Sequence, residues 1–155
     1  MALDLSLVIP AYNEERRLPA TLVDYVAYLS SRGLSYEVIV VNDGSSDRTK
    51  EVVENFSKLN PAVRLINLER NQGKGHAVKT GALATEGELI LFADADGATP
   101  IVELRRLEDG ITAGADLAIG SRAKKAEDTA VRTRLFLKIR GQTFNRIVNA
   151  LLLPS

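Results

Sequence analysis

The chain of 155 residues contains no cysteine, one histidine and as many acidic as basic residues. Without cysteine it has neither a disulfide framework nor a thiolate metal or catalytic site, and this composition fits a reducing compartment. It also lacks the run of about 18 apolar residues that a membrane span requires. The amino terminus, MALDLSLVIP, has neither the basic start nor the apolar length of a signal peptide. We therefore expect a cytoplasmic protein.

Common nucleotide-binding and hydrolase motifs are missing as well. No GxxxxGK[ST] phosphate loop occurs, and Gly73-Lys74-Gly75 does not begin a GxGxxG motif because the third glycine, Gly81, comes too late. These glycines can simply shape a turn and let a helix pack closely, but Lys74 is still a candidate phosphate ligand. No GxSxG motif accompanies His76, for which we expect a structural role. The absence of a GxGxxG motif argues against a dinucleotide-binding dehydrogenase.

The composition is that of an ordinary soluble globular protein. Hydrophobic residues make up 45% of the chain and charged residues 26%, which argues against disordered and collagen-like classes. The length allows one domain with a sizeable core, or a piece of one.

Apolar runs alternate with segments of helical periodicity along the chain. We expect strands at 3–9, 38–41, 63–68, 89–92 and 117–119, and helices at 18–29, from Ser45-Ser46 to Pro61, after Gly75 and at 101–113. Ser45-Ser46 is the expected N-cap, and Val52, Val53, Phe56 and Leu59 the inner stripe, of the second helix. Residues 89–92 read as a central strand that is buried on both faces.

This alternation predicts an α/β fold with a mostly parallel sheet. In such sheets ligands bind beyond the carboxyl ends of the strands. Polar and glycine-rich residues follow each expected strand and should therefore form one rim: 10–14, 42–44, 70–75, 94–97 and 120–122.

Two carboxylates follow the strand at 89–92. Asp94 and Asp96 are two residues apart, so in an extended segment they would point the same way. Neighbouring ionised carboxylates repel each other unless they share a proton or bind a cation. Oxygen ligands suit a hard ion such as Mg²⁺ or Mn²⁺. The alternative is a solvated acidic turn that Gly97 bends.

Four segments, taken together, carry a family resemblance: Pro10-Ala11-Tyr12-Asn13-Glu14, 42–49 (NDGSSDRT), 71–75 (NQGKG) and 94–99 (DADGAT). In this order and spacing the sequence resembles the family 2 glycosyltransferases of GT-A fold, and most closely their dolichyl-phosphate β-glucosyltransferase branch. The resemblance implies a GT-A (Rossmann-like) three-layer α/β/α sandwich. It covers the chain from Leu5 to Arg122.

The resemblance also implies residue roles. Asp94 and Asp96 would form the DxD site that binds the metal and the diphosphate and supports catalysis. The nucleotide-sugar pocket would be lined by Pro10, Ala11, Tyr12, Glu14, Asp43, Gly44, Lys74, Asp94 and Ala95. Asp43 would meet the base or ribose from the rim, and we expect the ligand-free fold not to depend on it. Arg122 and Arg132 would lie on the acceptor side.

By this resemblance we expect an inverting transferase that moves a hexose, glucose from UDP-glucose, to a polyprenyl or dolichyl phosphate with Mg²⁺ or Mn²⁺. Ala98 replaces the glutamine of the related mannose synthases, which favours the glucosyl branch. The alternatives are another donor such as GDP-mannose, a saccharide acceptor, or a sugar-nucleotide-binding module without turnover. No nucleic-acid partner is expected. Family members are longer, so we expect a catalytic-domain fragment.

The charge is distributed unevenly. Residues 122–146 hold eight basic and two acidic residues, so the remainder of this neutral chain is acidic. We expect residues 1–122 to form the nucleotide-sugar-binding core and residues 123–155 a basic amphipathic helical segment on the acceptor side. This helix either lies on its own domain or makes peripheral contact with the cytoplasmic face of a membrane.

Overall fold

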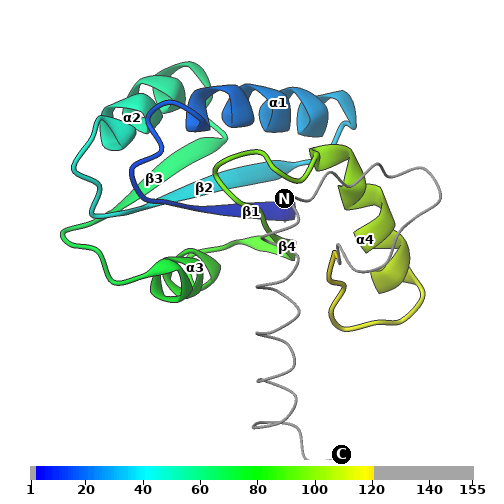
Figure 1. Ribbon diagram of the computed structural model, residues 1–155. Helices are drawn as coiled ribbons and strands as arrows, with labels where there is room; N and C mark the ends of the chain where they lie inside the picture. Colours follow the sequence, from blue (N-terminus) through cyan, green and yellow to red (C-terminus); the bar gives the residue numbers. More distant parts are fainter. Residues whose placement is uncertain (1–2, 121–155) are drawn as a thin grey trace, which may run out of the picture. The chain divides into compact units, whose positions relative to one another are not determined.

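The computed structural model describes residues 3–120 (Figure 1). The chain divides into two compact units, Met1–Asp109 and Gly110–Ser155. The predicted boundary at residue 122 and the predicted basic helix lie outside the described residues. In the part of the chain that the structure describes, no helix combines the length and the apolar composition needed to cross a membrane.

A parallel sheet of four strands forms the centre of the first unit. The strands are β1 (Leu3–Ala11), β2 (Tyr36–Asp43), β3 (Val63–Leu68) and β4 (Gly87–Phe92), in the spatial order β3-β2-β1-β4. Ile9 of β1 lies opposite Val40 of β2, and Val8 lies opposite Phe92 of β4. All four strands therefore end at the same edge of the sheet, as the alternating sequence pattern predicts.

Helices cover both faces of this sheet, so the three-layer prediction is confirmed. Figure 1 shows α1 (Leu18–Ser31) and α2 (Thr49–Leu59) over one face and α3 (Lys74–Ala82) over the other. A 3-10 turn, η1 (Ile101–Glu103), leads into α4 (Leu104–Thr112), which matches the helix predicted at 101–113.

Successive residues of the inner strands pack into two separate hydrophobic clusters because side chains alternate along a strand. Leu7 and Ile9 pack on the α1 and α2 side, and Val8 packs with Ala77 on the α3 side. Helix α3 approaches closely: a Cβ atom on Gly81 would collide with the Val8 side chain. The inner strands β1 and β2 hold half of the buried hydrophobic residues among those that the structure describes.

Two strand predictions are wrong. β4 is an edge strand in the described sheet rather than a central one, and Ile90 and Phe92 are 45% and 48% exposed. Leu117 and Ile119 form no strand among the described residues and are exposed. A short apolar run does not by itself reveal whether a neighbouring strand is present to bond its backbone.

The start of α2 also differs from the prediction. The helix begins at Thr49, and Asp47 accepts hydrogen bonds at Oδ1 from the Thr49 amide (2.9 Å) and hydroxyl (2.5 Å). The Ser45 hydroxyl instead accepts from the Asn13 amide. On the inner stripe Val53 is fully buried, but Leu59 is 84% exposed because it is the last residue of the helix.

Candidate functional site

A cleft of about 350 Å³ lies at the carboxyl ends of the strands, where ligands bind in sheets of this type. The residues that line it come from the carboxyl ends of β1 and β2, from the loops after β1, β3 and β4, and from α3: Pro10, Ala11, Tyr12, Glu14, Asp43, Asn71, Lys74, Ala77, Asp94, Ala95 and Asp96. The structure thus brings together every predicted donor-site residue except Gly44. Arg122 and Arg132 lie outside the described residues.

Gly44 shapes the wall of the cleft without lining it. Its φ of +65° belongs to the left-handed region that favours glycine. A Cβ atom there would also collide with the backbone of Arg70 and Asn71. Gly44 therefore allows the loops after β2 and β3 to pack against each other.

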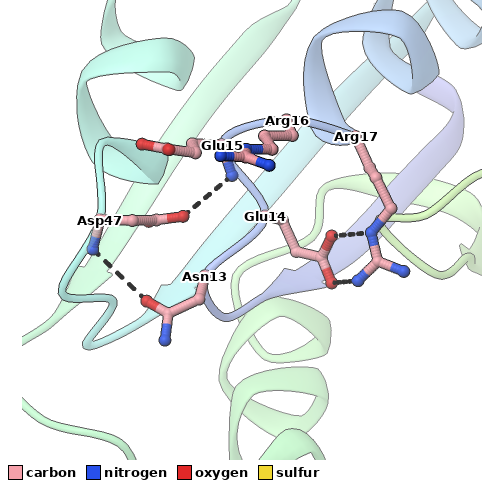
Figure 2. A pocket seen from close by; sticks show the side chains of 6 residues that line it. All are labelled: Asn13, Glu14, Glu15, Arg16, Arg17 and Asp47. Atoms are coloured by element: carbon pink, nitrogen blue, oxygen red, sulfur yellow. Dashed lines mark hydrogen bonds and ion pairs between the residues drawn. The ribbon is translucent and has the colours of Figure 1, made fainter.

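The loop after β1 is clasped to the loop before α2. Asn13, at φ +55°, accepts at Oδ1 from the Ser46 amide (2.9 Å), while the Glu14 amide donates to the Thr49 hydroxyl (2.8 Å). The Glu15 amide donates to Asp47 Oδ2 (3.1 Å). A second hollow, of about 250 Å³, is lined by Asn13, Glu14, Glu15, Arg16, Arg17 and Asp47, whose side chains Figure 2 shows. The clasp orders the loop that carries Tyr12 and Glu14.

Asp43 lines the cleft and is only 2% exposed. Its two carboxylate oxygens accept hydrogen bonds from the Gln72 and Gly73 amides, both at 2.8 Å. Asp43 therefore orders the loop before α3, and the expectation that the ligand-free fold does not depend on it is revised. Each oxygen keeps a second lone pair that a nucleotide could use.

The two aspartates after β4 both line the cleft, and each has a basic neighbour. Lys74 Nζ lies 2.5 Å from Asp94 Oδ1, and Arg17 Nη1 lies 3.7 Å from Asp96 Oδ2. Asp96 Oδ1 also accepts from the Ala98 amide at 3.0 Å. These cations offset the repulsion that the sequence predicts between the two carboxylates.

Three residues on α1 and at its start contact the site, and none of them was predicted to do so from the sequence. Arg17 donates through Nε and Nη2 to the two oxygens of Glu14, at 2.7 and 2.5 Å (Figure 2). The Thr21 hydroxyl donates to the Ala95 carbonyl (3.0 Å) and the Tyr25 hydroxyl to the Thr99 carbonyl (3.3 Å). Their spacing of four residues, which places polar groups on one face of a helix, was the available signal.

The electrostatics agree with this arrangement. The hydrogen bonds to Glu14 raise the pKa of Arg17, so its guanidinium stays charged. Burial raises the pKa of the Tyr25 hydroxyl, and the nearby charges of Asp94 and Asp96 add to this effect. Tyr25 is therefore a neutral donor to the acidic loop at physiological pH.

The residues present fit a divalent ion that is bound together with a substrate. Within residues 3–120 no cluster of three or more His, Cys, Asp or Glu side chains is placed to hold a metal. Asp94 and Asp96 supply two carboxylates, and Mg²⁺ is commonly bound by one or two carboxylates together with substrate phosphates and water. The oxygen-only donor set thus suits a diphosphate-bound Mg²⁺ or Mn²⁺.

Residues 6–152 match the family model described as glycosyl transferase family 2. The chain belongs to this family. Among curated proteins it is 46% identical over 145 residues to a dolichyl-phosphate beta-glucosyltransferase of Trichomonas vaginalis, covering 87% of this chain and 45% of that protein. For the Drosophila melanogaster dolichyl-phosphate beta-glucosyltransferase the identity is 43% over 150 residues, covering 88% and 46%. The chain thus spans somewhat under half the length of these relatives.

Two solved structures resemble the fold of this family 2 chain. Mannosyltransferase PcManGT from Pyrobaculum calidifontis, in complex with GDP-Man and Mn²⁺, superimposes with a TM-score of 0.56 at 26% identity, covering 62% of this chain and 28% of that one. S. aureus TarS 1–349 gives a TM-score of 0.56 at 26% identity, covering 72% and 33%. The GT-A fold predicted from the motifs is confirmed.

Proposed function

We propose that this chain is the donor-binding part of an inverting glycosyltransferase that moves glucose from UDP-glucose to dolichyl or another polyprenyl phosphate. The observation that carries the proposal is the cleft itself. It joins a paired-aspartate loop, a lysine and the Tyr12–Glu14 loop at the carboxyl ends of the strands, in a chain whose relatives are dolichyl-phosphate beta-glucosyltransferases.

Different residues of the cleft would bind different parts of the sugar-nucleotide donor. Tyr12 is 48% exposed and would offer a ring face to the base, while the buried Asp43 would accept hydrogen bonds from the base or ribose. Pro10, Ala11, Glu14 and Ala95 would complete the nucleotide pocket. Lys74, at the start of α3, would meet the diphosphate, since a helix amino terminus favours anions.

Asp94 and Asp96 would hold a divalent ion, which when bound neutralises charge that develops on the leaving diphosphate. Lys74 and the α3 amino terminus would help to stabilise the same charge. The acceptor phosphate has a second pKa near 6, so at neutral pH it is largely dianionic and needs little help from a general base. The chain therefore needs to position the acceptor more than to remove a proton from it.

The basic segment 122–146 supports a membrane-side acceptor. Its eight basic residues, with Arg122 and Arg132 among them, would attract the acceptor phosphate and the anionic surface of a membrane from the cytoplasmic side. Co-sedimentation with anionic and neutral vesicles at low and high salt tests this contact. Binding should need anionic lipid, weaken in high salt and fall in a variant with Arg132, Arg134 and Lys138 changed to glutamine. Equal recovery in every condition would contradict the electrostatic contact.

A specific observation favours a second candidate, transfer from GDP-mannose: the neighbouring mannosyltransferase structure holds GDP-Man and Mn²⁺. A radiolabel assay with UDP-glucose and GDP-mannose, each with and without polyprenyl phosphate, separates the candidates. Transfer of label to polyprenyl phosphate from UDP-glucose but not from GDP-mannose supports the proposal. Transfer of label from GDP-mannose supports the second candidate. Donor binding without transfer to any acceptor would indicate a binding module instead.

A further inference from the structure

The lining of the cleft is more acidic than a site for an anionic ligand should be. Four carboxylates line it, those of Glu14, Asp43, Asp94 and Asp96, and Lys74 is the one lining residue with a positive charge. The lining thus carries three net negative charges. A nucleoside diphosphate is also an anion, so like charges would oppose its entry unless cations offset them.

Arg17 supplies a positive charge next to two residues of this lining. It does not line the cleft, but it binds both oxygens of Glu14 and lies 3.7 Å from Asp96. Glu14 follows β1 and Asp96 follows β4, so one guanidinium joins two loops that are distant in sequence. A bidentate guanidinium–carboxylate pair also fixes orientation, which a single point charge does not.

The same side of α1 holds the acidic loop at two further points. Thr21 and Tyr25 follow Arg17 at intervals of four residues and donate to the Ala95 and Thr99 carbonyls. Gly97 in this loop has a φ of +63°, and a Cβ atom there would lie 3.0 Å from the Thr21 hydroxyl. Thr21 and Tyr25 act on the loop backbone, whereas Arg17 acts on the carboxylates themselves.

We propose that Arg17 is a positioning residue of the donor site. It holds Glu14 and Asp96 in the arrangement that accepts a nucleoside diphosphate with its divalent ion, and it offsets part of the acidic charge of the lining. The inference rests on the proposed function for the class of ligand, a nucleoside diphosphate. It concerns binding, so it does not depend on which sugar is transferred.

The first test is calorimetry of UDP binding in Mn²⁺ with Arg17→Gln. Loss of a charge-assisted bidentate contact should weaken UDP binding about tenfold or more. Binding of Mn²⁺ alone, followed by electron paramagnetic resonance, should not weaken, because a cation near Asp96 has been removed. Arg17→Lys keeps the positive charge but cannot make the bidentate contact with the Glu14 carboxylate. Its UDP affinity should therefore lie between those of the wild type and Arg17→Gln.

A matched control and a double variant separate positioning from general damage. Arg105→Gln changes an exposed arginine on α4 that has no hydrogen bond or ion pair within the described residues, and it should leave UDP affinity unchanged. The Arg17 side chain is 58% exposed, so Arg17→Gln should keep the ligand-free melting temperature. In a Glu14→Gln background the effect of Arg17→Gln on UDP affinity should shrink to about threefold or less, because interacting residues are not additive.

Several outcomes would overturn the inference. Unchanged UDP affinity in Arg17→Gln would show that Arg17 plays no part in donor binding. An effect fully additive with Glu14→Gln, or a joint fall in Mn²⁺ affinity and melting temperature, would show a role other than positioning. If the wild type binds neither UDP nor GDP in Mn²⁺, both the proposed function and the inference about Arg17 are wrong. If the wild type binds UDP and Arg17→Gln binds it equally well, only the inference about Arg17 is wrong.

Discussion

Asp43 connects the stability of a loop to ligand binding through one carboxylate. Its oxygens accept from the Gln72 and Gly73 amides inside the cleft wall. Asp43→Ala should lower the free energy of unfolding by about 1–2 kcal/mol, since two backbone donors lose their partner, and should also weaken UDP binding. Thermal melting and calorimetry check this, with exposed Asp24→Ala as the control. A melting temperature equal to that of the wild type would show that the loop does not depend on Asp43.

Glu37 carries a residue-scale prediction about pH. Burial alone would raise its pKa, but hydrogen bonds from the Ser6 hydroxyl and the Glu86 amide, together with Arg64, lower it below the ordinary value of 4.5. Because the pKa of Glu37 is lower in the folded than in the unfolded protein, its carboxylate stabilises the fold at pH values above the ordinary pKa. This stability is lost as the pH falls through the lowered pKa.

Glu37→Gln should therefore be less stable than the wild type at neutral pH, by about 1–3 kcal/mol. The difference should shrink as the pH falls below about 4.5. Denaturant unfolding from pH 7 to pH 3 measures it, with the exposed Glu54→Gln as the control. A difference between Glu37→Gln and the wild type that stays constant over this range would contradict the lowered pKa.

Among the helices and strands, α3 packs closely against the sheet at Gly81. Gly81→Ala would force a methyl group into the Val8 side chain, so it should destabilise by about 1–3 kcal/mol although alanine favours helices. Gly75→Ala in the same helix has nothing within 4 Å and should be neutral or stabilise by up to about 1 kcal/mol. Denaturant unfolding of both variants checks this, and equal effects would contradict the close packing.

Element types were predictable from periodicity where the burial of an element matches its pattern. β2 is buried along most of its length and α1 has a continuous apolar stripe, so both follow the sequence prediction. β4 has an equally apolar run but is an edge strand of the described sheet. Its edge position could not be predicted from the sequence, because the presence of a neighbouring strand depends on tertiary structure. Ser45 does not cap α2, because its hydroxyl is engaged by Asn13 and Asn42 and because Arg48 occupies the N-cap position.

At the scale of the whole molecule, topology assembles the candidate site from loops up to about eighty residues apart. A parallel sheet brings its carboxyl ends to one edge, so Tyr12, Asp43 and Asp94 could be predicted to meet there. Arg17 could not be found in this way. It belongs to a helix rather than to a strand end, and its partner Asp96 is near only because β4 pairs with β1.

Calorimetry of UDP with and without Mn²⁺ on the wild type and Asp96→Asn shows whether the paired aspartates bind the divalent ion of the donor site. Asparagine keeps a side-chain oxygen for the Ala98 amide, so Asp96→Asn should melt within a few degrees of the wild type. Loss of the carboxylate should abolish Mn²⁺-dependent UDP binding, whereas the control Asp24→Asn should bind like the wild type. UDP binding by Asp96→Asn with wild-type affinity and wild-type Mn²⁺ dependence would contradict the account.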